Sequence, residues 1–589
     1  MMLPRAFCVL LLLVVGASRF ISADEALVQP KQVDPLRLVP QNAIALFHCS
    51  QPKLAVDQLL GYVNRLELTR FDEVQELLNS TPYQRFSRYL QYLEKEYDRP
   101  WGKLLDDITG NGLVVAVLQP DEPKKQPQVL GAVEAKDAEL LHRVYLAALE
   151  FIKQEAESAE NPAKATTKNY RAVSITSLGD QFCLAQHGST LLLATTARVM
   201  TKAIDQLLDN KADSIHQHHR FVPTERPRSA DLLGWGWIDV KYLKDQAKED
   251  IEKFKLPTND LLPHLLFGGL LDAVIRSDHA WIAIRADAQG PAIELTSPVG
   301  RAKSQEGARL LHMHDPEKEP LLPLLNPPGT LASTSFYWNL SSLWQQRDKY
   351  YKEGALKEFD EADKQVKPFL AGNSLGSLMN TLGARHRLVI ATQRQSGYKS
   401  RPKTAYPAFA FVAECTNPDQ FSKIIAVPLR TAGFFFSTQV NMKLFDETYH
   451  NSKITGYRFA ENEKNHGYDQ GSLFNYSPSF ARVGNFFVIS STVELCKDLI
   501  DEIQLPTSAS SVGDHADLRQ RFSWSALSQA VAAERPLLVS LLTLRHGGAV
   551  ERVDDQINAL LKLLDRLGTL DLTIHHSPGF KLELRANYR

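Results

Sequence analysis

The chain repeats itself, and this internal duplication limits its possible folds more than any other feature. Three pairs of segments match in the same order along the chain: Pro127–Glu134 with Pro407–Glu414, Leu191–Thr196 with Phe487–Thr492, and Gly290–Leu295 with Gly579–Leu584. Their offsets are similar, at 280 (407 − 127), 296 (487 − 191) and 289 (579 − 290) residues. Colinear matches at similar offsets predict two related halves. With 589 residues, the chain is also too long for one ordinary core.

We expect one repeat over residues 38–300 and a second over residues 328–589. Residues 301–327 are rich in charge and proline, which is typical of a linker. Short strands joined by polar turns, such as His187-Gly188-Ser189, favour antiparallel pairing. Helices cluster between groups of strands, so the expected fold class is α+β, with two tandem homologous halves, each mainly antiparallel sheet with packed helices.

The last strand before the terminal helix and hairpin is predicted from apolar runs in both halves. We place it at Leu233–Val240 in the first half and at Leu537–Leu544 in the second. Helices should follow at Leu261–Ile275 and Val550–Leu567, and each half should close with a hairpin.

The N-terminus predicts export. A basic start, Met1–Arg5, precedes the apolar run Ala6–Val15, and small residues follow up to Ala23. This run is about half of the ~20 residues that a membrane span requires. We therefore expect a cleaved signal peptide over residues 1–23, with cleavage after Ser18 as the alternative. A short extension over residues 24–37 and a periplasmic or secreted location follow.

Composition excludes some partners. Lys and Arg number 67 against 68 Asp and Glu, a net charge of −1, which becomes −3 (65 − 68) after loss of Arg5 and Arg19. Such a balance offers no bulk attraction for nucleic acid. No segment after the signal is apolar for long enough to span a membrane, because Pro263, His264 and Asp272 interrupt the best candidate.

Four cysteines remain after signal cleavage: Cys49, Cys183, Cys415 and Cys496. They are far apart in the sequence and form no C-x-x-C pair. We interpret them as small buried apolar residues, with one disulfide as the alternative.

Three segments carry a family resemblance: LVPQNAIALFHC at residues 38–49, LGAVEAKDAELL at 130–141 and GSTLLLATT at 188–196, followed by AIDQLL at 203–208. With the N-terminus, they resemble an uncharacterised, numbered domain-of-unknown-function family of exported bacterial proteins, here as two tandem copies. The resemblance implies an exported or membrane-anchored protein. It implies no catalytic residue, because that family has no established site.

Gly372-Asn373-Ser374-Leu375-Gly376 matches the G-x-S-x-G nucleophile elbow of α/β-hydrolases. In that elbow a strand leads into the serine, whereas here the preceding residues 359–368 are polar and helix-like. Aligning the halves also places Pro100 opposite Ser374, and proline cannot be a nucleophile. We expect Ser374 to cap a helix, and a serine hydrolase using Ser374 is the alternative.

His216, His218 and His219 form the closest histidine cluster, and weak metal binding is a second alternative function. The cluster does not recur in the other half. The carboxylate pairs Asp106-Asp107 and Asp554-Asp555 are predicted to lie on solvated helix faces. The aromatic runs at 235–237, 336–338 and 434–436 are predicted to be core.

The matches between the halves keep apolar strands and turn residues but no polar constellation. We therefore expect an exported, non-enzymatic protein that acts as a binding, scaffold or envelope-associated interaction module. No cofactor is implied, and the partner is an unidentified protein or envelope component.

Overall fold

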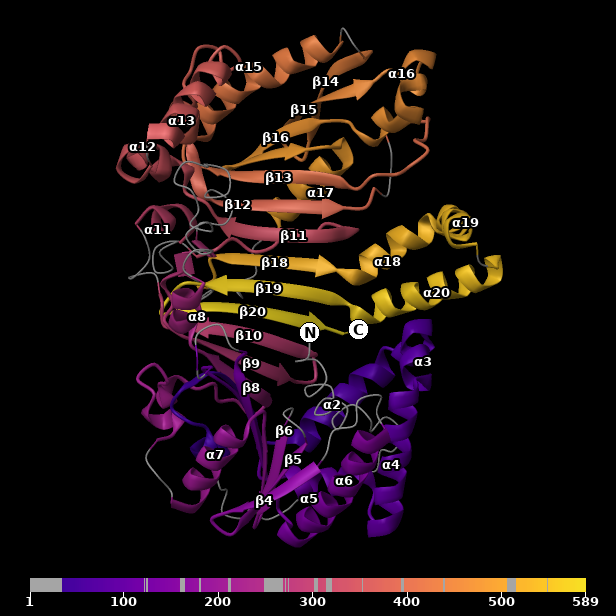
Figure 1. Ribbon diagram of the computed structural model, residues 1–589. Helices are drawn as coiled ribbons and strands as arrows, with labels where there is room; N and C mark the ends of the chain where they lie inside the picture. Colours follow the sequence, from indigo (N-terminus) through magenta and orange to yellow (C-terminus); the bar gives the residue numbers. More distant parts are fainter. Residues whose placement is uncertain are drawn as a thin grey trace. The chain divides into compact units, whose positions relative to one another are not determined.

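The computed structural model divides the chain into two compact units (Figure 1). The first unit comprises Met1–Gln246 and Asp278–Leu295, and the second comprises Ala247–Ser277 and Thr296–Arg589. The structure describes residues 34–588, with gaps at 121, 123–125, 159–164, 179–181, 210–212, 248–268, 271, 274, 301–305, 314–319, 352, 394–396, 438–439, 506–514 and 548. The predicted signal peptide over residues 1–23 and much of the segment 261–275 lie outside the described residues.

An antiparallel sheet forms the centre of the first unit. Its strands lie in the spatial order β10, β9, β8, β1, β2, β3, β7, β6, β5, β4. Their bounds are β1 Ala43–Cys49, β2 Leu113–Leu118, β3 Gln128–Glu134, β4 Ala165–Tyr170, β5 Val173–Leu178, β6 Phe182–His187, β7 Thr190–Ala194, β8 Leu232–Ile238, β9 Ala280–Ala286 and β10 Pro291–Ser297. In β2, half-buried and buried side chains alternate, because successive residues of a strand point to opposite faces.

Helices of the first unit pack on this sheet and on each other. Their bounds are α2 Pro52–Arg65, α3 Asp72–Asn79, α4 Thr81–Tyr97, α5 Trp101–Thr109, α6 Ala138–Ser158, α7 Ala197–Asp209 and α8 Val240–Gln246. The main core contains Trp235, Trp237 and Trp281, each at most 3% exposed. The prediction that the aromatic run at 235–237 is core is therefore confirmed. A smaller core joins Leu90 and Leu93 of α4 to α2 and α5.

The second unit has a sheet of the same kind. Its strand order is β20, β19, β18, β11, β12, β13, β17, β16, β15, β14, which is the first order with ten added to each number. The bounds are β11 Thr330–Tyr337, β12 Leu382–Ala391, β13 Ala408–Cys415, β14 Met442–Tyr449, β15 Ser452–Phe459, β16 Ser479–Val483, β17 Phe486–Ser490, β18 Leu518–Ser523, β19 Thr569–His575 and β20 Phe580–Asn587. Helices and antiparallel strands in both units confirm the α+β class.

The helices of the second unit are α11 Glu306–His312, α12 Leu340–Tyr350, α13 Glu353–Val366, α14 Leu375–Met379, α15 Pro418–Ser437, α16 Glu463–Gly467, α17 Val493–Gln504, α18 Trp524–Ala533, α19 Arg535–His546 and α20 Val550–Leu567. The core on one face of the sheet includes Val412 of β13 and Leu499 of α17. On the other face, Phe421 of α15 meets Phe480 and Phe487.

The described residues of the segment 301–327, which composition suggested to be a linker, pack in the second unit. There Leu311 of α11 is fully buried in one cluster with Leu343 and Phe359. Further on, Leu325 enters the sheet core, and the carbonyl of Leu322 accepts a hydrogen bond from Ser335 at 2.7 Å. Leucines interspersed among the prolines explain this packing, since they give the segment apolar surface to bury.

The predicted strand at Leu537–Leu544 is wrong, because these residues form the middle of helix α19. A short continuous apolar run fits a buried strand and a helix equally well by periodicity. The strand that pairs with β11 is instead β18, whose sequence LRQRFS carries little apolar signal. The predicted helix at Val550–Leu567 and the closing hairpins are confirmed.

Cys49, Cys183, Cys415 and Cys496 are all buried and free, as the first interpretation of the cysteines predicts. Burial raises the pKa of Cys49 to about 11 and those of Cys415 and Cys496 to about 12. Within the part of the chain that the structure describes, no helix has the length and hydrophobicity needed to cross a bilayer.

Candidate functional site

Ser374 is the N-cap of α14, as expected. Its Oγ accepts a hydrogen bond from the Ser377 backbone N–H at 3.0 Å and lies 2.8 Å from Ser377 Oγ. Within the described residues, the Ser374 hydroxyl hydrogen-bonds to no histidine or carboxylate. In the first unit, Pro100 occupies the N-cap position of α5. The hydroxyl therefore satisfies a free backbone donor at the start of a helix.

Both glycines of the G-x-S-x-G motif have a local structural explanation. Gly372 has φ +83, a left-handed conformation that favours glycine. A Cβ atom at Gly376 would lie 2.1 Å from Nε1 of Trp344, so only glycine allows this ring to pack there. Turn geometry and helix packing thus account for the motif without a nucleophile elbow, and helix α13 precedes the turn in place of a strand.

The three histidines of the predicted metal cluster have different surroundings. His216 is exposed, with Nε2 3.8 Å from a carboxylate oxygen of Asp34. His218 is buried, and its ring stacks on that of His219 with 5.0 Å between centroids. Among the described residues, no group of three or more His, Cys, Asp or Glu side chains is arranged to hold a metal ion.

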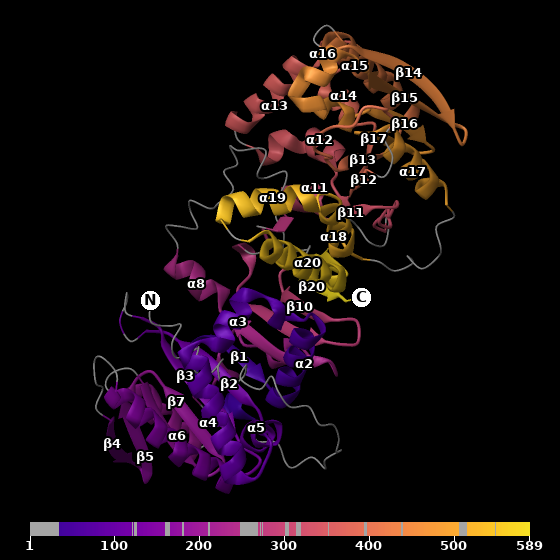
Figure 2. The same ribbon diagram turned by 90° about the vertical axis from the view of Figure 1, so that its right-hand side faces the viewer.

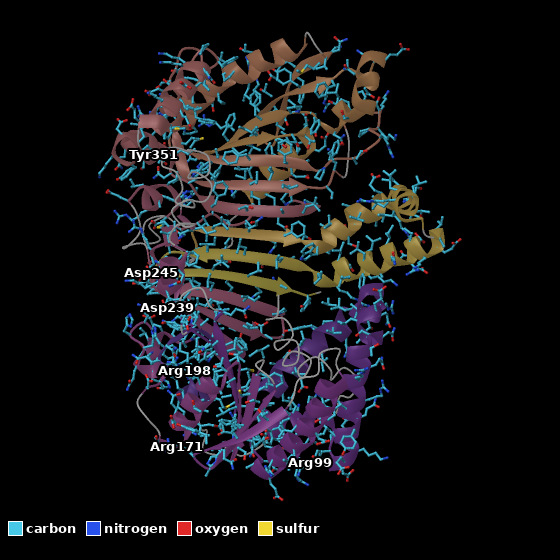
Figure 3. The ribbon with its side chains drawn as sticks, viewed as in Figure 1. Arg99, Arg171, Arg198, Asp239, Asp245 and Tyr351 are labelled. Atoms are coloured by element: carbon cyan, nitrogen blue, oxygen red, sulfur yellow. The ribbon has the colours of Figure 1, made fainter. Side chains whose placement is uncertain are left out.

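Asp239, labelled in Figure 3, is the centre of the buried polar cluster around His218. It is fully buried directly after β8, and its carboxylate accepts hydrogen bonds from Arg220 Nε at 2.9 Å and from the Tyr242 backbone N–H at 2.9 Å. His218 Nε2 lies 3.4 Å from the same carboxylate, and burial lowers the pKa of His218. Arg220 and His218 precede β8, and Tyr242 lies on α8. Because all three contact Asp239, the cluster holds the loop before β8 against helix α8.

A tyrosine–aspartate pair occurs in both units. Tyr170, at the end of β4, donates a hydrogen bond to Asp205 of α7 at 3.1 Å, and Tyr449, at the end of β14, donates one to Asp501 of α17 at 2.9 Å. In each unit the two residues after the tyrosine have positive φ and form the hairpin turn. The pair therefore ties an outer hairpin to a core helix.

This pair corrects the expectation that the halves share no polar constellation. The two aspartates already align at the offset of 296 (501 − 205), whereas the tyrosines are 279 residues apart (449 − 170). The segments between differ in length, so a comparison at a single offset could not find them. The sequence feature that could have revealed the pair is a tyrosine directly before a two-residue turn in both halves.

Removing the hydroxyl should weaken this tie. We expect Tyr449→Phe to lower the free energy of unfolding of the second unit by about 1–2 kcal/mol, because a hydrogen bond to a charged acceptor is lost. Tyr170→Phe should do the same in the first unit. Urea denaturation of the whole chain measures both. Tyr406→Phe is the matched control in the second unit, because Tyr406 is exposed and its hydrogen bonds to the described residues are made by its backbone. An equal loss in that variant would contradict the prediction.

The carboxylates at Glu134 and Glu414, which align at the offset of 280, are both surrounded by protein. Glu134 is 1% exposed, accepts a hydrogen bond from Thr190 Oγ1 at 2.8 Å, and has a pKa that burial raises. Glu414 is contacted by the guanidinium of Arg385, whose Nε lies 3.0 Å from one carboxylate oxygen. Both carboxylates are therefore engaged by side chains of their own unit.

A pocket at the start of α17 has a volume of about 130 Å³. Thr392 and Gln393, after β12, line it together with Thr492, Glu494 and Asp498. Sites that enclose a metabolite-sized ligand usually have about 300–1,000 Å³. This pocket is too small for such a ligand.

The helices α18, α19 and α20 form what we call the helical arm of the second unit, and Figure 2 shows α19 beside α20. Ser528 of α18 donates a hydrogen bond to the Leu561 carbonyl at 2.8 Å, and α20 turns Val553 and Ile557 inward. Arg535 binds Asp554 through two hydrogen bonds, which fixes the start of α19 to α20.

Three leucines on α19 face solvent, and we call them the leucine stripe. Leu537 is 39% exposed, Leu541 53% and Leu544 83%. Their spacing of four and three residues places them on one face of the helix. Unlike the polar clusters around Asp239, Glu134 and Glu414, these leucines are left exposed by the packing of their own unit.

No family model matches this sequence, and no curated protein matches it. The solved structures that it is similar to include three crystal forms of TP0453. Form III is 11% identical with a TM-score of 0.25, covering 48% of this chain and 88% of that one; form IV is 10% identical with a TM-score of 0.25, covering 45% and 81%. Form I is 10% identical with a TM-score of 0.22, covering 46% and 81%. What the chain does is therefore inferred from its own side chains.

Proposed function

We propose that the chain is an exported, non-enzymatic interaction module. The leucine stripe on α19 is the observation that carries this proposal. Monomeric proteins rarely leave apolar side chains grouped on one exposed helix face unless that face binds something. The polar groups around Asp239, Glu134, Glu414 and Ser374, by contrast, all have partners within their own unit.

We also propose that the two units arose by duplication of one α+β repeat. Their identical strand orders support this. So do the registers: Gln128 pairs with Leu118 as Ala408 pairs with Ala391, and Ala194 pairs with Leu130 as Ser490 pairs with Ala410. The resulting offsets, 280 (408 − 128) and 296 (490 − 194), are those of the sequence matches.

Export into the periplasm or medium is supported by the N-terminal pattern of basic, apolar and small residues. The balanced charge of the chain favours a protein or envelope component as the partner over nucleic acid.

A fluorophosphonate probe separates this proposal from the serine hydrolase. We expect no labelling of the exported protein, and Ser374→Ala should cost about 1 kcal/mol of stability through loss of the helix cap. Ser377→Ala is the matched control, because it leaves the Ser374 hydroxyl in place. Labelling that is lost in Ser374→Ala and kept in Ser377→Ala would refute the non-enzymatic proposal.

A further inference from the structure

The leucine stripe lies on a helix whose opposite side is already occupied. Arg535 and the contacts with α20 hold α19 in the helical arm, so Leu537, Leu541 and Leu544 cannot turn inward without breaking that packing. None of the α19 side chains that the structure describes is fully buried. Covering the stripe therefore requires a second surface.

The two ends of α19 carry opposite charges without ion-pair partners. Glu534 is the N-cap residue, and its side chain makes no capping hydrogen bond. Arg545, in the last turn, is exposed. Within the described chain, neither side chain forms an ion pair. The stripe is thus bordered by a free anion at the start of the helix and a free cation at its end.

We propose that the stripe is the contact between two copies of this chain, with the two α19 helices antiparallel. In that arrangement Leu541 meets Leu541 of the second copy at the symmetry axis, and Leu537 meets Leu544 on either side. Glu534 of each copy then lies near Arg545 of the other, which satisfies both charges. The N-terminal end of each helix dipole also faces the C-terminal end of its neighbour.

Charge argues against a lipid surface as the occupant. The arm, residues 524–567, carries five Lys and Arg residues and five Asp and Glu residues, so it has no net charge to attract an anionic membrane. A copy of the same helix, by contrast, supplies both the leucines and the complementary end charges.

The contact should be reversible. A helix of 12 residues is about 18 Å long, so a single antiparallel pair buries less area than the ~1,200–2,000 Å² of stable complexes. We therefore expect a monomer–dimer equilibrium that depends on protein concentration.

This inference rests on the proposed function, since it names the partner of the same surface, but the two can fail separately. Labelling of Ser374 by the fluorophosphonate probe would refute the proposed function. A chain that stays monomeric would refute only the self-association.

Sedimentation velocity over a range of protein concentrations tests the dimer. Leu541→Glu should raise the dimer dissociation constant at least about tenfold, because it places two like charges at the centre of the contact. Leu505→Glu is the matched control, because Leu505 is 60% exposed at the end of α17 and outside the arm. Equal weakening by both variants, or a wild-type monomer at every concentration, would overturn the proposal.

Cysteine cross-linking tests the direction of the helices. In a Cys8→Ser background the remaining native cysteines are buried, so an introduced cysteine is the exposed one. Mixing Leu537→Cys with Leu544→Cys under mild oxidation should give the mixed disulfide, whereas parallel helices would give only disulfides between identical variants. That second pattern would overturn the antiparallel arrangement.

Charge exchange tests the role of the helix ends. Glu534→Arg and Arg545→Glu should each weaken the dimer, and the double variant should restore the wild-type dissociation constant to within about twofold. Circular dichroism checks that α19 still folds. Failure of the double variant to restore the dimer, or binding of the monomer to phosphatidylcholine vesicles that Leu541→Glu abolishes, would overturn the proposal.

Discussion

Glu414→Gln is expected to lower the free energy of unfolding of the second unit by about 3 kcal/mol. Glu414 holds the guanidinium of Arg385 through several hydrogen bonds. Its charge also compensates that of Arg387, which is 4% exposed and has two buried nitrogens, Nε and one Nη, without hydrogen-bond partners among the described residues. Neutralising Glu414 leaves the guanidinium groups of Arg385 and Arg387 close together in a poorly hydrated environment, without the carboxylate that offsets their charge.

Burial lowers the pKa of Arg387 to about 10, and Glu414 opposes that shift. Arg387 therefore stays charged at neutral pH, with its guanidinium 4.6 Å from the Phe486 ring centroid. Arg387→Met removes this buried cation, so its own effect should be within about 1 kcal/mol of zero or stabilising. Glu414→Gln should then cost less in the Arg387→Met background than in the wild type.

A double-mutant cycle in urea measures this coupling. Asp571→Asn is the matched control, because Asp571 binds Arg521 through two hydrogen bonds on the surface of the same sheet. An exposed pair of this kind should contribute about 1 kcal/mol or less. If Glu414→Gln cost no more than Asp571→Asn, the Glu414 carboxylate would not stabilise the second unit more than an exposed one does.

Acid is expected to destabilise both units, through one buried histidine in each. Burial lowers the pKa of His48 in the first unit and of His386 in the second from 6.5 to about 4. In both, Nδ1 is buried and has no hydrogen-bond partner in the part of the chain that the structure describes. His386 Nε2 lies 3.1 Å from the Trp338 carbonyl, and its ring stacks on Phe411.

The direction of this pH dependence follows from the number of protons that the folded and unfolded chains bind. Between pH 6.5 and 4 the unfolded chain binds a proton at each histidine and the folded chain does not, so stability falls as the pH falls through this window. Each histidine should account for about 3 kcal/mol of lost stability at pH 4. Above pH 6.5 neither contributes a pH dependence.

Urea denaturation from pH 7 to pH 4 tests this, comparing wild type with His48→Phe and His386→Phe. Carboxylates titrate in the same range, so the informative quantity is the difference between wild type and variant at each pH. That difference should shift by about 3 kcal/mol in favour of the variant as the pH falls to 4. His187→Phe, at an exposed position, is the control: it shows whether replacing any histidine changes the pH dependence of stability. A constant difference for His48→Phe and His386→Phe would contradict the prediction.

Much of the fold was predictable because apolar strands leave a local signal. Pro127–Glu134 and Pro407–Glu414 overlap β3 and β13, and the helix predicted at Val550–Leu567 is α20. The strand β18 was missed because Arg519, Gln520 and Arg521 break any apolar alternation. There the pairing with β11 and β19 overrides the local pattern.

The side-chain clusters were harder to predict because they join distant residues. Ser374 as a helix cap could be expected from its immediate neighbours, whereas Glu414 and Arg385 are 29 residues apart and meet only when β12 pairs with β13. The leucine stripe was hidden by the misassignment of Leu537–Leu544 as a strand, since a strand would have divided these leucines between two faces.

The buried cysteines allow local unfolding of each unit to be followed by the reactivity of its thiols. Cys49 and Cys183 lie in the first unit, and Cys415 and Cys496 in the second, so the described part of each unit encloses two thiols. While a unit is closed, burial shelters its thiols from alkylating agents. Reaction at a given cysteine therefore records which unit has opened, and how often, without any label being introduced.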